Sequence, residues 1–152
     1  MNNRALLSVF TAASMVGCAM HAPVAEGGPG KASKTCDEKA VKCDVVISVA
    51  SCTPEGITLD HPVLGVAKGS RDVDIRWTIA TPGYAFAKDG VKFKGGDWPK
   101  EFDLPEGNKN KYKWRDRNNL DTGERSYDYS VTIMKSDGSA CATKDPTIVN
   151  DA

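Results

Sequence analysis

The sequence DVDIRWTI, residues 72–79, alternates polar and apolar side chains along its whole length. The apolar residues recur at every second position: Val73, Ile75, Trp77 and Ile79. Successive side chains of a β-strand point to opposite faces of the sheet. This stretch therefore predicts an amphipathic strand with one face in a hydrophobic core and the other in water.

Shorter strands are expected on both sides of this stretch. The β-branched run 43–51 predicts a strand covered on both faces, and Asp89-Gly90 predicts a hairpin turn between two strands. The chain contains 14 glycines and 8 prolines and no long helical periodicity, which predicts many turns. We expect an all-β antiparallel two-sheet sandwich, immunoglobulin-like or cupredoxin-like, with an up-and-down barrel as the alternative. The expected strands are 43–51, 57–59, 63–67, 72–79, 84–86, 91–93, 102–104, 111–115, 125–134 and 147–149.

The first 17 residues predict an export signal. Arg4 is their only charged residue, and residues 5–16 form an apolar run too short for a bilayer, which needs about 20 residues. The sequence MVGC, residues 15–18, resembles the lipobox of bacterial lipoproteins, which implies that Cys18 is fatty-acylated after cleavage and anchors the protein. Ala19 after this cysteine implies the outer membrane, with the domain in the periplasm or at the cell surface. An ordinary cleaved signal is the alternative.

The sequence divides into three parts. Residues 1–17 form the signal peptide, residues 18–35 the lipidated N-terminus with a flexible linker rich in Ala, Gly and Pro, and residues 36–152 the β-sandwich domain. Removing residues 1–17 takes away Arg4 and no acid, so the 20 basic and 20 acidic residues of the full chain become a net charge of −1. Such a balance offers no long-range attraction for nucleic acid.

Several short motifs resemble a widespread family of small, uncharacterised bacterial β-sandwich proteins. The resemblance extends over residues 72–150 and implies the fold without an activity. It is carried by WTI (77–79), GYAF (83–86), GVKF (90–93), YDYSV (127–131) and DPTIVN (145–150).

Four cysteines remain in the domain, Cys36, Cys43, Cys52 and Cys141, an even number for an oxidising compartment. If residues 43–52 are one extended strand, its ends lie about 30 Å apart, far beyond disulfide reach. This excludes a Cys43–Cys52 pair. We favour Cys36–Cys43 with Cys52–Cys141, and Cys36–Cys52 with Cys43–Cys141 stays open. No pair has zinc-site spacing.

The sequence offers weak candidates for catalysis or metal binding. Blue copper needs two imidazoles and a thiolate, whereas the domain has only His61, which is expected to be a turn residue; His21 falls in the linker. Asp72 and Asp74 are a weak candidate for a carboxylate pair, and alternation on a solvent face explains them. Residues 116–121 faintly resemble a calcium loop, and a plain turn is favoured. We expect no catalytic residue, metal or cofactor.

A row of cations is the remaining feature. On an extended strand it would occupy one face, with Tyr112 and Trp114 on the other. Such a row suits an anionic envelope component or an acidic envelope protein, although lysines also guard edge strands against aggregation. We expect a non-enzymatic, lipid-anchored protein of the cell envelope that acts as a binding or structural module. The alternative is an inhibitor or immunity lipoprotein that acts through residues 95–107. A third hypothesis is an envelope hydrolase. The row consists of Lys109, Lys111, Lys113, Arg115 and Arg117.

Overall fold

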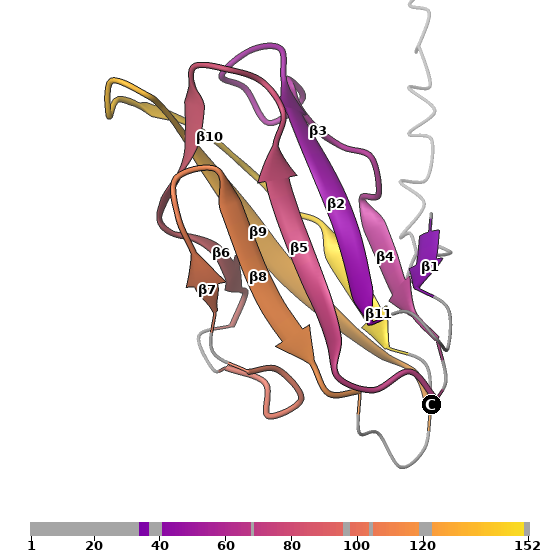
Figure 1. Cartoon of the computed structure of the whole chain (residues 1–152). Helices are drawn as coiled ribbons and strands as arrows, with labels where there is room; N and C mark the ends of the chain where they lie inside the picture. Colours follow the sequence, from indigo (N-terminus) through magenta and orange to yellow (C-terminus); the bar gives the residue numbers. More distant parts are fainter. Residues whose placement is uncertain are drawn as a thin grey trace, which may run out of the picture.

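The computed structural model of the protein describes residues 34–36, 41–67, 69–95, 98–103, 105–118 and 123–150. Two sheets pack against each other in this part of the chain, and it contains no helix (Figure 1). The predicted all-β sandwich is confirmed. Sheet I contains β1 (Lys34–Cys36), β4 (Val63–Val66), β11 (Thr147–Asn150), β9 (Arg125–Lys135) and β10 (Ala140–Lys144) in that order, with β6 (Tyr84–Phe93) on the other side of β9. Sheet II has the order β3 (Ile57–Leu59), β2 (Lys42–Val49), β5 (Val73–Ile79), β8 (Lys111–Asp116) and β7 (Glu106–Gly107).

Both sheets are mixed, so the prediction of purely antiparallel sheets is wrong. The pairs β1–β4, β4–β11 and β2–β5 are parallel. Parallel neighbours need a crossover connection. After β2 and β3 the chain leaves sheet II, forms β4 in sheet I, and returns to sheet II as β5. β4 therefore lies in the crossover connection between the parallel strands β2 and β5, where an α/β fold has a helix.

The strand β2 is buried on one face only. Its side chains alternate strictly between exposed and buried, so Val45, Ile47 and Val49 enter the core. Val46 on the opposite face is 39% exposed. The expectation of a strand covered on both faces is therefore wrong, because the β-branched Val46 fits a strand equally well on the solvent side.

The residues predicted to form a hairpin instead belong to the single strand β6. Phe86 pairs with Ile133 and Val91 with Val131, so four residues of β6 lie opposite a single residue of β9. Asp89 has a positive φ of 53°, and a Cβ on Gly90 would lie 2.8 Å from a backbone oxygen. The chain therefore turns at Asp89-Gly90, as predicted, but the turn forms a bulge within one strand and does not connect two strands.

An aromatic cluster joins the two sheets at their centre. Trp77 of β5, Trp114 of β8 and Tyr129 of β9 are fully buried, with ring centroids 4.8 to 5.6 Å apart. The indole N–H of Trp77 donates a hydrogen bond of 3.0 Å to the Tyr129 hydroxyl. Burial raises the pKa of Tyr129, so this hydroxyl stays neutral. The alternation at residues 72–79 therefore positions the core as predicted, with Val73, Ile75, Trp77 and Ile79 all buried.

Candidate anion-binding surface

The expected lipid anchor at Cys18 and most of the expected linker lie outside the described residues. Lys34 and Thr35 are the exception, because they form β1 together with Cys36 and pair with β4. Two residues that the sequence assigns to the linker thus belong to a strand of sheet I.

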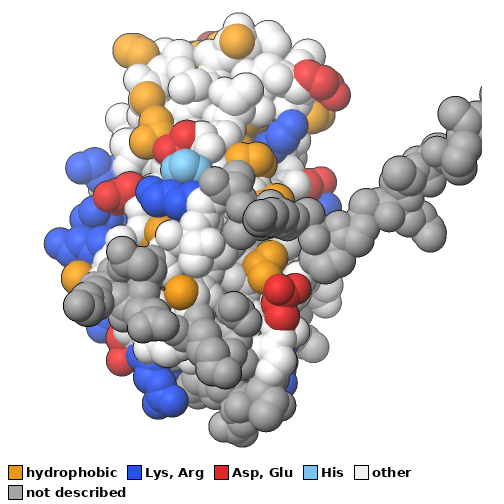
Figure 2. All heavy atoms as spheres, turned by 90° about the vertical axis from the view of Figure 1, so that its right-hand side faces the viewer, with side chains coloured by type: hydrophobic (Ala, Val, Ile, Leu, Met, Phe, Trp, Pro, Cys, Tyr) orange, Lys and Arg blue, Asp and Glu red, His pale blue; other side chains and the backbone are white. Residues whose placement is uncertain are grey.

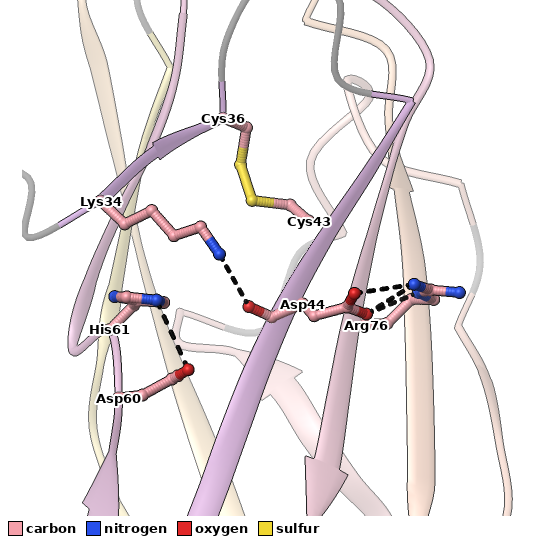
Figure 3. Close-up of a disulfide and its surroundings, with 7 residues drawn as sticks. All are labelled: Lys34, Cys36, Cys43, Asp44, Asp60, His61 and Arg76. Atoms are coloured by element: carbon pink, nitrogen blue, oxygen red, sulfur yellow. Dashed lines mark hydrogen bonds and ion pairs between the residues drawn. A yellow bond between two sulfur atoms is a disulfide. The ribbon is translucent and has the colours of Figure 1, made fainter.

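Two disulfides connect the sheets. Cys36 of β1 is bonded to Cys43 near the start of β2, with 6.0 Å between their Cα atoms (Figure 3). Cys52, which follows β2, is bonded to Cys141 of β10, with 4.6 Å between Cα atoms. This is the pairing favoured from the sequence. It attaches both ends of β2 in sheet II to strands of sheet I.

The predicted alternation of the basic row holds within β8. Tyr112 and Trp114 are buried, whereas Lys111, Lys113 and Arg115 lie on the outer face of sheet II. Lys109 and Arg117, beyond the two ends of the strand, are also exposed. β8 is an inner strand, however, because β5 pairs with one side of it and β7 with the other. Protection of a bare edge does not explain the row.

Acidic side chains neutralise much of this row. Arg115 Nε lies 2.8 Å from Asp74 Oδ1, and Lys113 Nζ lies 2.9 Å from Glu106 Oε2. Arg117 pairs with Asp103. The hydrogen bond from Arg115 lowers the pKa of Asp74 further below its ordinary value than burial raises it.

The same interleaving of charges continues across the sheet. Arg76 on β5 pairs with Asp44 on β2, with 2.7 Å between Nη2 and Oδ1. Figure 3 shows this pair beside the Cys36–Cys43 disulfide, and Lys34 Nζ donates to the Asp44 carbonyl oxygen at 3.5 Å. In Figure 2, which faces the edge that carries β1, basic and acidic side chains are likewise interleaved. Most of this sheet face therefore carries no net field of one sign.

The amino-terminal end of the basic row differs from the rest of the row in its ion pairing. Across the ladder Lys111 lies opposite Thr78 of β5, Lys113 opposite Arg76 and Arg115 opposite Asp74. Lys109 lies in the turn before β8, and its carbonyl oxygen accepts a hydrogen bond of 2.7 Å from Phe86. Neither lysine forms an ion pair with another described residue. A groove of about 500 Å³ lies over this end of the sheet. It is lined by Asp44, Arg76, Trp77, Thr78, Glu106, Gly107, Asn108, Lys111, Tyr112 and Lys113.

His61 is held in a local contact at the edge of sheet I. Its Nε2 lies 3.4 Å from Asp60 Oδ2 (Figure 3). Asp60 Oδ1 accepts a hydrogen bond of 2.8 Å from the Val46 N–H. Asp60 thereby links a turn to the edge of β2. The proposed carboxylate pair is not on one strand face, because Asp72 precedes β5 in a turn with φ of 55°, while Asp74 lies within the strand.

A buried carboxyl group was missed by sequence reasoning. Asp116 is fully buried, and its Oδ1 accepts hydrogen bonds from the Asn118 N–H at 2.9 Å and the Asn150 side-chain amide at 3.0 Å. Its Oδ2 has no hydrogen-bond partner among the described residues. Burial raises the pKa of Asp116 to about 7. The signal was present in the sequence, since Asp116 continues the inward alternation of Tyr112 and Trp114.

The segment expected to act as an inhibitory loop, residues 95–107, is anchored to the domain through residues 98–103. Trp98 stacks edge-on against Trp114 at 5.2 Å and donates its indole N–H to the Phe102 carbonyl oxygen at 2.7 Å. Phe102 itself is buried in the core. This part of the segment belongs to the packing of the sandwich.

Comparison with known proteins adds no assignment. No protein-family model matches the sequence, and no curated protein matches it significantly. The resemblances to the lipobox and to small bacterial sandwich proteins stay predictions. Within the ranges that the structure describes, no cluster of three His, Cys, Asp or Glu side chains is placed to hold a metal ion. The same ranges contain no helix long and apolar enough to span a membrane.

Proposed function

We propose that this protein is a lipid-anchored component of the bacterial cell envelope, and that its sandwich domain is a non-enzymatic binding module for an anionic envelope component. The observation that carries the binding role is the cationic row on the exposed face of sheet II, in which Lys109 and Lys111 form no ion pair with a described residue. The two disulfides support an exported location, because such bonds persist in oxidising compartments. The MVGC motif supports the anchor.

The anchor is tested by mass spectrometry and fractionation of the full chain expressed in a Gram-negative host. We expect an amino-terminal peptide that begins at an acylated Cys18, and a protein that sediments with membranes. A Cys18→Ser variant should lose the lipid and leave the membrane fraction. An unmodified Cys18 in the wild-type protein would refute the anchor.

The binding role is tested by charge reversal. Replacing Lys111, Lys113 and Arg115 with glutamate should reduce co-purification of the domain with envelope material. The control replaces Lys92, Lys94 and Lys100, which have the same total charge. It breaks one ion pair, Lys94 with Asp145, whereas the first variant breaks two. Circular dichroism checks that both variants fold. Unchanged co-purification of the first variant, or an equal loss in both, would contradict the proposal.

A further inference from the structure

Four lysines surround the turn between β7 and β8. Lys109 and Lys111 belong to the turn and to the start of β8, Lys88 lies in the looped-out part of β6, and Lys135 ends β9. None of them forms an ion pair with a residue that the structure describes. Acids do lie nearby: Asp89 lines a hollow with Lys88 and Lys109, Asp44 and Glu106 line the groove with Lys111, and Lys135 is close enough to help lower the pKa of Asp137. We call these four lysines the turn lysines.

Three adjoining hollows bring the turn lysines together. The groove of about 500 Å³ over sheet II shares Gly107, Asn108 and Tyr112 with a second hollow of about 370 Å³, which Lys88 and Lys109 also line. Lys109 in turn lines a third hollow of about 470 Å³ together with Lys135. The hollows therefore form one continuous surface around the turn. Each has a volume typical of small-molecule sites.

The turn holds a hydrogen-bond donor in a fixed orientation at the centre of this surface. Asn108 Oδ1 accepts hydrogen bonds from the Asn110 and Lys111 N–H groups at 3.1 and 3.0 Å. Two backbone donors fix this atom as the oxygen, so the side-chain NH₂ points away from them and has no partner among the described residues. Gly107, just before the turn, packs so closely on Tyr112 that a Cβ would lie 2.5 Å from the ring.

This arrangement suits a chain of acidic sugar units. Carboxylates would accept hydrogen bonds from Asn108 Nδ2 and ion pairs from Lys109 and Lys111, while hydroxyl groups would meet the amide of Asn110 and the hydroxyl of Ser136, which also line the third hollow. A flat lipid surface fits less well, because the surface is hollowed. The large hydrophobic side chains exposed in the described ranges, Val41 and Val46, line none of the three hollows.

We propose that the turn lysines and Asn108 bind an acidic polysaccharide through its carboxylates. This inference rests on the proposed binding function and names its ligand class. The surface also faces away from the edge where the described chain begins: β6 and β7 lie on the left of Figure 1, and β1 on the right. A domain tethered at β1 would therefore present this surface to material on its far side.

The test measures binding of the purified, disulfide-bonded domain to polygalacturonate, with neutral dextran and anionic phospholipid vesicles as comparison probes. We expect binding to polygalacturonate that weakens with salt. The double variant K109E/K111E should weaken it roughly tenfold or more, whereas the control K92E/K100E, with the same change in charge, should leave it within about twofold.

A third variant separates a specific site from a general field. Asn108→Asp keeps the oxygen that accepts the two turn hydrogen bonds but replaces the NH₂ donor with a carboxylate oxygen. It should fold with an unchanged melting temperature and lose binding. Equal losses for the two lysine variants, or full binding by Asn108→Asp, would overturn the proposed site. Binding to anionic vesicles without binding to polygalacturonate would overturn the polysaccharide while leaving the envelope-binding function intact. In a further outcome, the domain binds neither probe while charge reversal on β8 still reduces its co-purification with envelope material. That result would indicate a protein partner. It would overturn the polysaccharide inference and leave the envelope-binding function intact.

Discussion

The buried carboxyl group of Asp116 makes the stability of this domain depend on pH near neutrality. Its pKa is about 7 in the folded protein, against 3.8 for an ordinary aspartate, because desolvation outweighs the hydrogen bonds that it accepts. The folded state thus binds a proton more tightly than the unfolded state. The stability that this neutral carboxyl group contributes is fully present below pH 3.8 and is lost as pH rises through about 7.

The size of the effect follows from the two pKa values. Each pKa unit corresponds to about 1.4 kcal/mol, so the total change in the free energy of unfolding is about 4 kcal/mol. Between pH 5 and pH 8 roughly 3 kcal/mol of it should be seen. Asp74 contributes little in this range, since its pKa is lowered and its stabilisation disappears only on acidification.

The assay is urea unfolding of the disulfide-bonded domain between pH 5 and pH 8, followed by tryptophan fluorescence. The wild-type protein should lose stability as pH rises. Asp116→Asn retains the oxygen that accepts hydrogen bonds from Asn118 and Asn150 but does not ionise, so its stability should vary much less and exceed that of the wild type at pH 8. The reasoning is refuted if the two proteins show the same pH dependence.

Three further substitutions test the packing. Replacing Cys52 and Cys141 with alanine opens a loop of 89 residues and should cost about 4.6 kcal/mol in chemical unfolding. The other disulfide closes a loop of 7 residues, and its removal should cost about 2.4 kcal/mol. Equal costs would argue against the chain-entropy explanation. Tyr129→Phe leaves the indole N–H of Trp77 buried without its acceptor and should cost about 1–3 kcal/mol, so a variant as stable as the wild type would contradict the role of this hydrogen bond. Gly90→Ala should lower the melting temperature, because its Cβ would lie 2.8 Å from a backbone oxygen of the looped-out segment, and no change would mean that the loop yields freely.

Local alternation predicted the strands that define the core. β5 and β8 follow from their period of two, and the outward phase of the basic row follows from the same pattern. β10 was missed because the sequence ACATK has small side chains that are only half-buried, and its place depends on pairing with β9. β1 was missed for a similar reason: three residues pair with the distant β4.

Which cations of the candidate site are ion-paired with acids could not be predicted from the sequence. Arg115 and Asp74 are 41 residues apart and meet only because β5 and β8 pair in one register. The gathering of Lys88 with Lys109 likewise depends on the loop in β6, where the Asp-Gly signal correctly indicated a turn but not that both arms belong to one strand. Long-range register thus decides which cations remain free.

The Cys36–Cys43 bond also has a mechanical meaning. A pulling force that enters the domain from the amino-terminal side reaches β1 first, and three residues paired with β4 would resist little if they were peeled away one at a time. The covalent cross-link carries that load directly into β2, which shares six paired positions with β5. A domain held by its amino-terminal end would therefore bear tension through the middle of sheet II and not through its weakest strand.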